Sequence, residues 1–321
     1  MAIINPSTVN YQLSMERQKI IFLLFAVCLF AACSNEDEPI NPPLVIRVTE
    51  NPMTDATAPN NVARRGQVVD NSNFSAFTMR YGNEDTYTYT VTKSGSTWST
   101  SPTDSPGAGE HTFYAFSAGT FNWNGGSPYL SFSVENNVTP QKDLLVAKTA
   151  PITGNEVDLS FNHICSAVQF KICKTAAMAD YVITVTTVDL CNVVNQGDYY
   201  FNTEAWSLGS SKTYYTLNTA AITLGTTATD LDLASGTEYL FMIPQTLEAW
   251  DKTAISSSPT GCYLRLYCTI QKGGSYVKGY KTNNYAYLPI RGTWEKGKKY
   301  IITLNVGTAL RDGSGTKITG L

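Results

Sequence analysis

The N-terminal part of the chain places one thiol, that of Cys33, where it could be covalently modified. An apolar run, residues 20–30, follows the basic residues Arg17 and Lys19, and two alanines separate it from Cys33. The run is too short to span a bilayer as a helix and has the charge pattern of a signal peptide. Removal of that peptide would leave a cysteine at the new N-terminus.

The two alanines and Cys33 resemble a bacterial lipobox, in which a signal peptidase cuts before a cysteine that has received a lipid. Phe30 departs from the pattern, which usually has an aliphatic residue there. The resemblance implies that residues 1–32 are removed, that residues 33–43 form a lipidated acidic tether, and that the protein is exposed on the outer membrane. The alternative is an ordinary signal peptide with a cysteine near its cut site.

The remaining cysteines are best interpreted as buried, reduced thiols that pack as small hydrophobic groups. Outside the signal peptide and the lipid site they are Cys165, Cys173, Cys191, Cys262 and Cys268. An odd number cannot pair completely within one chain. Their spacings match no zinc motif, and only His111 and His163 could assist, so we expect no metal site and no cofactor.

No motif for catalysis or nucleotide binding is present in the sequence. There is no Gly-x-Ser-x-Gly elbow, no phosphate-binding glycine loop and no His-Glu-x-x-His. A Ser-His-Asp triad stays open from composition alone, because serine is abundant and two histidines exist. The formal net charge of −3 lacks the basic balance of nucleic-acid-binding proteins. An enzyme is therefore the least favoured class, and we expect no nucleic-acid partner.

Alternation of apolar and polar residues predicts an all-β protein. In residues 44–49 the side chains of Leu44, Ile46 and Val48 share one face, which predicts a first strand. The same alternation recurs along the chain between short turn signals, and no long amphipathic helix is evident. In residues 157–161 the odd positions are apolar, but beyond residue 163 the even ones are, which predicts a bulge or corner at residues 163–166.

A dibasic pair, Arg64 and Arg65, lies in a segment rich in Asn, Pro, Thr and Ala, residues 51–67. Such a composition predicts an exposed, extended connection, which a trypsin-like protease could reach. The alternative is a solvated pair of charges in a loop.

Several segments resemble the fimbrillin-like family. They are residues 138–147, 157–163, 197–199, 242–245 and 294–300. Their order and spacing, with the lipoprotein leader, cover nearly the whole mature chain. Each has a structural interpretation too: Pro244 ends a strand, Trp294 covers the core edge, and His163 is a hydrogen-bonded residue at a bulge.

The resemblance implies two tandem transthyretin-like β-sandwich domains, residues 44–151 and 152–321, in a stalk, tip or anchor subunit of a type V pilus. It implies that cleavage at Arg64 or Arg65 displaces the first strand with Leu44, Ile46 and Val48. The C-terminal segment of the next subunit, within residues 307–321, would then fill the groove. That segment is only weakly apolar, so it could instead be a closing hairpin of a tip or anchor subunit.

The expected partners are other fimbrial subunits, the outer membrane through the lipid at Cys33, and a host glycan or protein. The alternative function is a glycan-binding surface lipoprotein of a nutrient-uptake system, because the chain is rich in Tyr and Trp. A glycan binder should present exposed aromatic rings as a flat platform, whereas a fimbrial subunit should have a removable first strand.

Overall fold

The computed structural model describes residues 42–55, 72–82, 87–136, 141–231, 239–280 and 284–321. Residues 43–321 form one compact unit, to which all the elements below belong. Cys33, Arg64 and Arg65 lie outside the described residues. The described chain is nearly all β, as the alternating sequence predicted, with two single-turn 3₁₀ helices. These are η1 (Ala176–Met178) and η2 (Ile255–Ser257).

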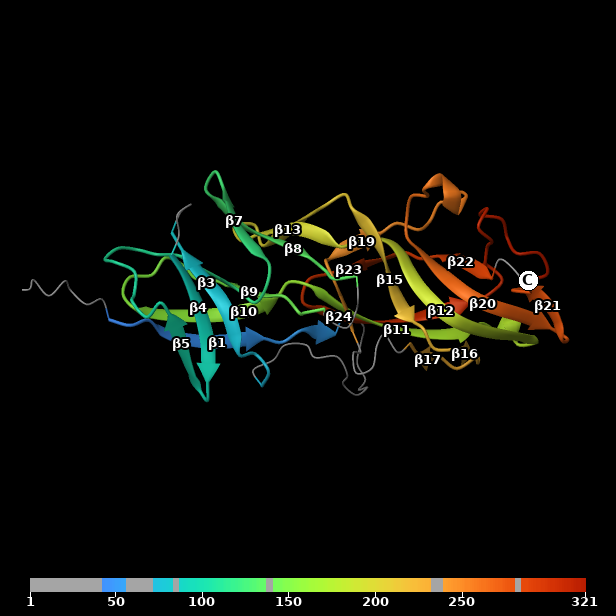
Figure 1. Ribbon diagram of the computed structural model, residues 1–321, viewed down its shortest axis with the longest axis horizontal. Helices are drawn as coiled ribbons and strands as arrows, with labels where there is room; N and C mark the ends of the chain where they lie inside the picture. The colour runs from blue at the N-terminus through green and yellow to red at the C-terminus, as the bar shows by residue number, and fades with distance from the viewer. Residues whose placement is uncertain (1–41, 56–71, 83–86, 137–140, 232–238, 281–283) are drawn as a thin grey trace, which may run out of the picture. The chain divides into compact units, whose positions relative to one another are not determined.

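The largest sheet has seven strands and surrounds an aromatic-rich core. Most of its strands are labelled in the left part of Figure 1. In sheet order its strands are β1 (Val45–Asn51), β10 (Glu156–His163), β9 (Leu145–Lys148), β6 (Phe113–Phe116), β3 (Ala76–Tyr81), β4 (Tyr87–Ser94) and β5 (Thr97–Ser101). The two outer strands, β1 and β5, contact each other, so the sheet curls around its inner face. Phe74, Phe77 and Phe161 meet there with ring centroids 4.9–5.7 Å apart.

Two further sheets enclose the largest core. One contains β17 (Thr229–Asp230), β11 (Ser166–Lys174), β24 (Lys298–Val306), β2 (Thr54–Asp55) and β18 (Leu240–Met242). The other contains β15 (Lys212–Asn218), β12 (Tyr181–Val194), β20 (Tyr263–Lys272), β21 (Ser275–Lys278), β16 (Ile222–Thr223) and β22 (Tyr285–Pro289). Alternate residues supply the core from each sheet, for example Phe170 from β11 and Leu266 from β20, both with no exposed surface.

The remaining strands form a four-stranded sheet and a two-stranded one. They are β14 (Ala205–Leu208), β13 (Gln196–Tyr200), β8 (Ser127–Ser133) and β7 (Thr120–Asn124), then β19 (Gln245–Leu247) and β23 (Gly292–Trp294). Pairing of β8 with β13, and of β9 with β10, joins segments from both sides of residue 151. The division into domains at residues 151 and 152 stays a prediction.

The change of alternation at residues 163–166 is a corner between two sheets. Strand β10 ends at His163 in the seven-stranded sheet, and β11 begins at Ser166 in the sheet that contains β24. Ile164 and Cys165 lie between them with no exposed surface. The predicted corner is confirmed, because two buried residues in succession are what shifts the inward side chains from odd to even positions.

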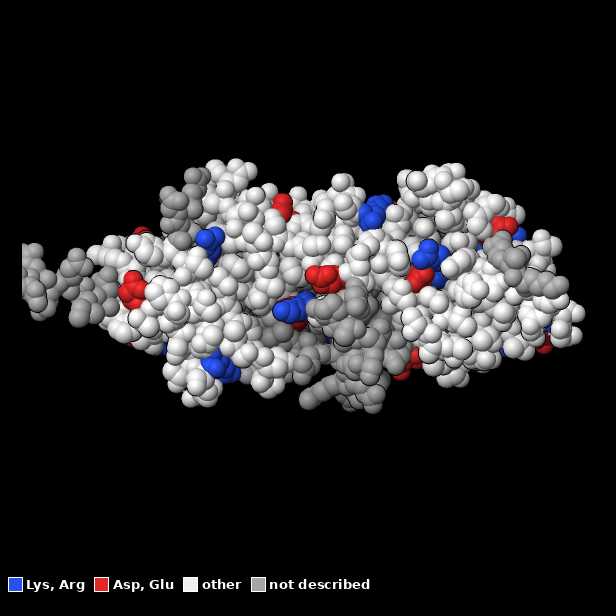
Figure 2. All heavy atoms as spheres, viewed as in Figure 1, with Lys and Arg blue, Asp and Glu red and all other residues white. Residues whose placement is uncertain are grey.

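Charged side chains are sparse on the described surface. In Figure 2, the lysines, arginines and carboxylates on the face in view are scattered, without a large patch of one sign. Among the described residues, no helix has the length and apolar character needed to cross a membrane.

Candidate functional site

The first strand, β1, occupies an edge of the seven-stranded sheet and runs parallel to β10. Ile46 lies opposite Val157 and Val48 lies opposite Leu159. Leu44 and Ile46 are each 7% exposed, while Val48 is half-buried against the same core. The predicted strand is therefore present, and its predicted inward face contributes to the core.

The outer face of β1 is held by charge. Arg47 forms ion pairs with Glu156 and Asp158 on β10, the latter at 2.6 Å from Nε to Oδ1. All three side chains are more than half exposed, so water and salt screen these pairs. The apolar face, not this one, supplies most of the attachment of β1 to the sheet.

Beyond β1 the chain continues onto a second sheet. Met53 is buried beside Ala167 and Phe241, and Thr54 and Asp55 then pair in parallel with Lys298 and Lys299 of β24. The N-terminal segment, residues 44–55, thus forms an edge strand on two sheets in turn. We call the surface that this segment covers on β10 and β24 the strand seat.

A buried chain of ionisable groups lies where the β10 part of the strand seat ends, before the segment continues onto β24. His163 Nε2 lies 2.8 Å from Glu50 Oε1, and His163 Nδ1 lies 2.7 Å from Asp143 Oδ2. The side chains of His163, Glu50 and Asp143 are 1%, 6% and 0% exposed. We call these three residues the carboxylate–histidine chain.

The carboxylate–histidine chain changes the proton affinity of the imidazole. Burial lowers the pKa of His163, but hydrogen bonds and negative charge from Asp143 and Glu50 outweigh burial, so the pKa is raised from 6.5. A protonated imidazole can donate to both carboxylates at once, one from each nitrogen. The geometry therefore fits a cation held between two anions.

The sequence predicts a hydrogen-bonded His163 at a bulge but does not identify its partners. For Glu50 a signal existed, because it has the same parity as the inward residues Leu44, Ile46 and Val48. Asp143 precedes β9 in a segment without strand character, so no periodic pattern marked its position.

The C-terminal segment is packed onto its own chain. Leu310 has no exposed surface and Ile318 is 7% exposed, both within the largest core. Arg311 exchanges two backbone hydrogen bonds with Tyr287 of β22. A Cβ on Gly315 would meet the backbone oxygen of Lys252 at 1.8 Å, so only glycine allows this close approach.

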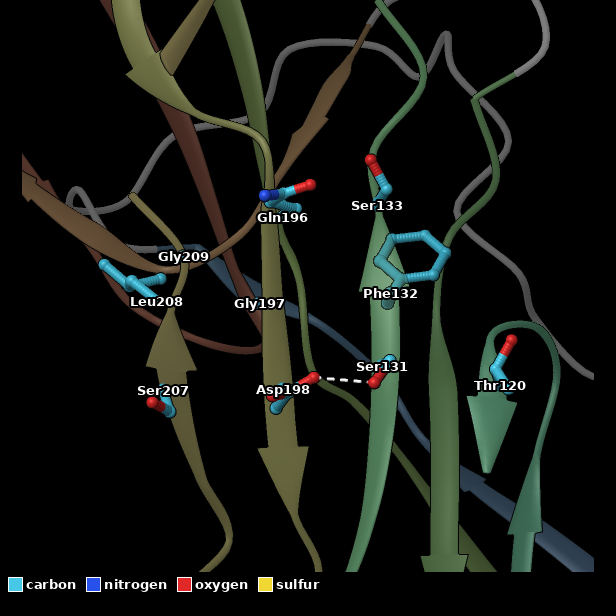
Figure 3. A pocket seen from close by; sticks show the side chains of 10 residues that line it. All are labelled: Thr120, Ser131, Phe132, Ser133, Gln196, Gly197, Asp198, Ser207, Leu208 and Gly209. Carbon is cyan, nitrogen blue, oxygen red and sulfur yellow. Dashed lines mark hydrogen bonds between the residues drawn. The ribbon is translucent and has the colours of Figure 1, made fainter. Parts of the chain in front are cut away.

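The outer face of the four-stranded sheet has an open recess of about 400 Å³ (Figure 3). It is lined by Thr120, Ser131, Phe132, Ser133, Gln196, Gly197, Asp198, Ser207, Leu208 and Gly209. Its one carboxylate, Asp198, accepts a 2.7 Å hydrogen bond from Ser131. Among the described residues, no group of three His, Cys, Asp or Glu side chains could hold a metal ion.

Exposed tyrosines gather around Arg265 on β20. The guanidinium is bound to Asp189 at 2.9 Å and lies 5.1 Å and 5.6 Å from the ring centroids of Tyr214 and Tyr285. The rings of Tyr285 and Tyr267 are inclined at 61° to each other. These rings do not form the flat platform expected of a glycan-binding surface.

A protein-family comparison connects this architecture to known proteins. The model of the fimbrillin-like family matches residues 53–320, most of the chain. The chain belongs to the fimbrillin-like family. The resemblance noted in the sequence is thereby confirmed. A comparison with curated protein sequences found no match.

A comparison with solved structures found proteins similar to this fimbrillin-like chain. A fimbrial protein from Bacteroides vulgatus is similar with a TM-score of 0.52 and 16% identity, covering 85% of this chain and 98% of that one. A proposed cell adhesion protein from Bacteroides ovatus is similar with a TM-score of 0.44 and 15% identity, covering 83% and 94%. At 16% identity, the likeness to the Bacteroides vulgatus protein is one of fold alone.

Proposed function

We propose that this fimbrillin-like chain is a subunit of a type V pilus that assembles by proteolysis and donor-strand exchange. A protease would cut at Arg64 or Arg65, the segment with Leu44, Ile46 and Val48 would leave, and a strand from another subunit would take its place. The lipid on Cys33 would hold the precursor at the outer membrane. A structural role without catalysis agrees with family membership.

The observation that carries the proposal is the position of residues 44–55. They form an edge strand on two sheets, and β1 can leave without breaking a strand pair between the other elements. Its loss would expose apolar side chains and unpaired backbone groups of β10, a surface that accepts another strand readily. Each fully buried Leu or Ile side chain stabilises by about 1.5–3 kcal/mol, so the uncut strand would block the strand seat.

The packed C-terminal segment supports a terminal position in the fibre. Residues 310 and 318 fill the chain's own core, and η2 and its neighbours lock the turn through the hydrogen bond from Ile255 N to Gly313 O. Such a segment is a closing hairpin and is not available to a neighbour. We therefore propose a tip or anchor position in the pilus, in which residues 307–321 stay in their own core.

Limited trypsin treatment of the folded precursor tests the processing step. We expect a product that begins at Arg65 or Gly66, and its loss in a chain with both Arg64→Ala and Arg65→Ala. Cleavage only at other sites, unchanged in that variant, would contradict the processing site. Arg47 is the internal comparison, because it lies within β1 and should resist cleavage in the folded chain.

A second experiment tests the terminal position. The processed chain alone should remain monomeric on unheated gels, because its C-terminal hairpin stays in its own core. Long ladders formed by the processed chain alone would show that it donates a strand and would refute the terminal assignment. The glycan-binding alternative is not favoured around Arg265, because the exposed rings of Tyr267 and Tyr285 are inclined to each other there. The adhesion ligand, a host glycan or protein, would be contacted elsewhere in the fibre or at its end.

A further inference from the structure

The inward face of the first strand ends in an acid. Leu44, Ile46 and Val48 face the core, and Glu50 is the next inward residue along β1. The inward row on β10 reads Val157, Leu159, Phe161 and His163. Glu50 lies opposite Phe161 in the strand register, and its side chain reaches His163, the next inward residue of β10. The part of the strand seat on β10 is therefore apolar over most of its length and polar where it ends.

The polar end cannot rearrange easily. His163 is fixed at Nδ1 by Asp143, which is itself fully buried, so Nε2 points into the strand seat with a defined direction. If Glu50 left, a buried donor would lose its partner, and a buried donor without a partner is strongly unfavourable. Any strand that fills the strand seat must then offer an acceptor at this level.

We propose that His163, positioned by Asp143, selects the strand that replaces β1 by requiring a carboxylate at its fourth inward position. This inference rests on the proposed exchange of the first strand. The fitting partner is a strand with three alternating apolar residues followed, two places later, by a glutamate. An apolar side chain at that level would leave Nε2 of the buried imidazole without a partner.

The partner strand comes from a different protein chain. In the C-terminal segment of this chain the nearest match is Val306, Thr308, Leu310 and Asp312. Thr308 stands where an apolar residue is required, Leu310 fills the chain's own core, and the shorter Asp312 already accepts hydrogen bonds from Ser314 and Thr316. The C-terminal segment of a second copy of this chain is therefore a poor donor.

Peptide exchange tests the selection. The protein is processed with trypsin, or through an engineered protease site at residues 60–65, and incubated with fluorescent peptides of residues 43–55. We expect the native peptide to bind about ten- to a hundredfold more tightly than the Glu50→Leu peptide. The Glu50→Gln peptide should lie between them, since its amide oxygen can accept but carries no charge.

Two controls make the result specific to His163. In a His163→Leu protein, or in His163→Gln if the former does not fold, the preference for Glu50 over Leu should disappear. A peptide of residues 306–312 tests the second copy as donor. Equal affinity of the native and Glu50→Leu peptides for the unmodified protein would overturn the selection, and tight binding of residues 306–312 would overturn the assignment to a different chain.

A thermodynamic cycle in the uncut chain separates this inference from the proposed function. Glu50→Leu, His163→Leu and the double variant are compared by their free energies of unfolding. Coupling is expected, with the double variant destabilised less than the sum of the single ones. If no peptide exchanges at all, strand exchange fails as a function, and the cycle still decides whether Glu50 and His163 recognise each other. Additive effects would overturn the inference.

Discussion

Thr54 Oγ1 accepts a 2.8 Å hydrogen bond from Lys298 Nζ, 244 residues further along the chain. This contact lies at the second half of the strand seat, where β2 pairs with β24. It connects the N-terminal segment to a sheet in which β1 has no part. The seat of the first strand is therefore longer than β1 alone.

Replacing Cys33 by serine should abolish fatty-acid labelling and release the protein from the membrane fraction. The physical reason is that the lipid would be the only strong attachment, and stable anchoring requires more than one acyl chain. Metabolic labelling followed by fractionation measures both effects. The matched control is the Cys28→Ser variant. Cys28 lies within the predicted signal peptide, so this variant should still be labelled at Cys33. Labelling that persists in Cys33→Ser would reject the lipoprotein prediction.

Truncating the inward face of β1 should destabilise the precursor. Ile46→Ala removes buried methyl groups and is expected to lower the free energy of unfolding by about 2–5 kcal/mol. Val45→Ala, on the exposed face, is the control and should change it by less than about 0.5 kcal/mol. Chemical denaturation measures both variants. A cost for Val45→Ala as large as that for Ile46→Ala would mean that the faces of β1 are misassigned.

The carboxylate–histidine chain should make stability depend on pH. The pKa of His163 is raised in the folded chain above its ordinary value of 6.5, so the folded state binds the proton more tightly than the unfolded state. The resulting stabilisation is fully present below pH 6.5 and is lost as pH rises through the folded pKa.

Urea unfolding at a series of pH values from about 6 to 9 measures this dependence. The difference in stability between the unmodified chain and His163→Leu should narrow as pH rises across that range. A constant difference, or one that widens with pH, would contradict a protonated imidazole between Glu50 and Asp143.

The five described cysteines should be unreactive until the protein unfolds. All are buried and unpaired, and burial raises the pKa of both Cys191 and Cys268 to about 12, so little thiolate exists at neutral pH. A chain that begins at Ser34 should take up no thiol reagent when folded and one equivalent per cysteine in denaturant. A disulfide would be revealed if two cysteines stayed unlabelled after thiol blocking in denaturant and the chain, apart from the added labels, were lighter by two hydrogen atoms than the fully reduced chain. That result would contradict the structure, in which all five cysteines are unpaired.

The sequence predicted those parts of the site that obey local alternation. Leu44, Ile46 and Val48 follow a period of two, and the parity change at residue 163 marked the corner before β11. Both signals arise because neighbouring side chains of a strand point to opposite faces. Extending the same parity by one step would have placed Glu50 inside as well.

Other parts could not be predicted, because they depend on contacts between distant segments. The pairing of β8 with β13 joins residues more than sixty positions apart. The alternation of side chains within a strand does not show which distant strand it pairs with. The two-residue strand β2 is too short to show a period. The position of Asp143 beside His163 likewise depends on how β9 approaches β10.

The continuity of residues 44–55 over two sheets has a mechanical meaning. A strand that fills both parts of the strand seat is hydrogen-bonded to β10 and to β24, so a pull on it is shared between two sheets. A contact between subunits in which one strand pairs with both β10 and β24 resists bending between the two sheets. Bending would have to stretch the inserted strand or break its hydrogen bonds. The stiffness of this contact would then depend on the length of the inserted strand. A donor strand that paired only with β10 would leave a hinge between the sheets that contain β10 and β24.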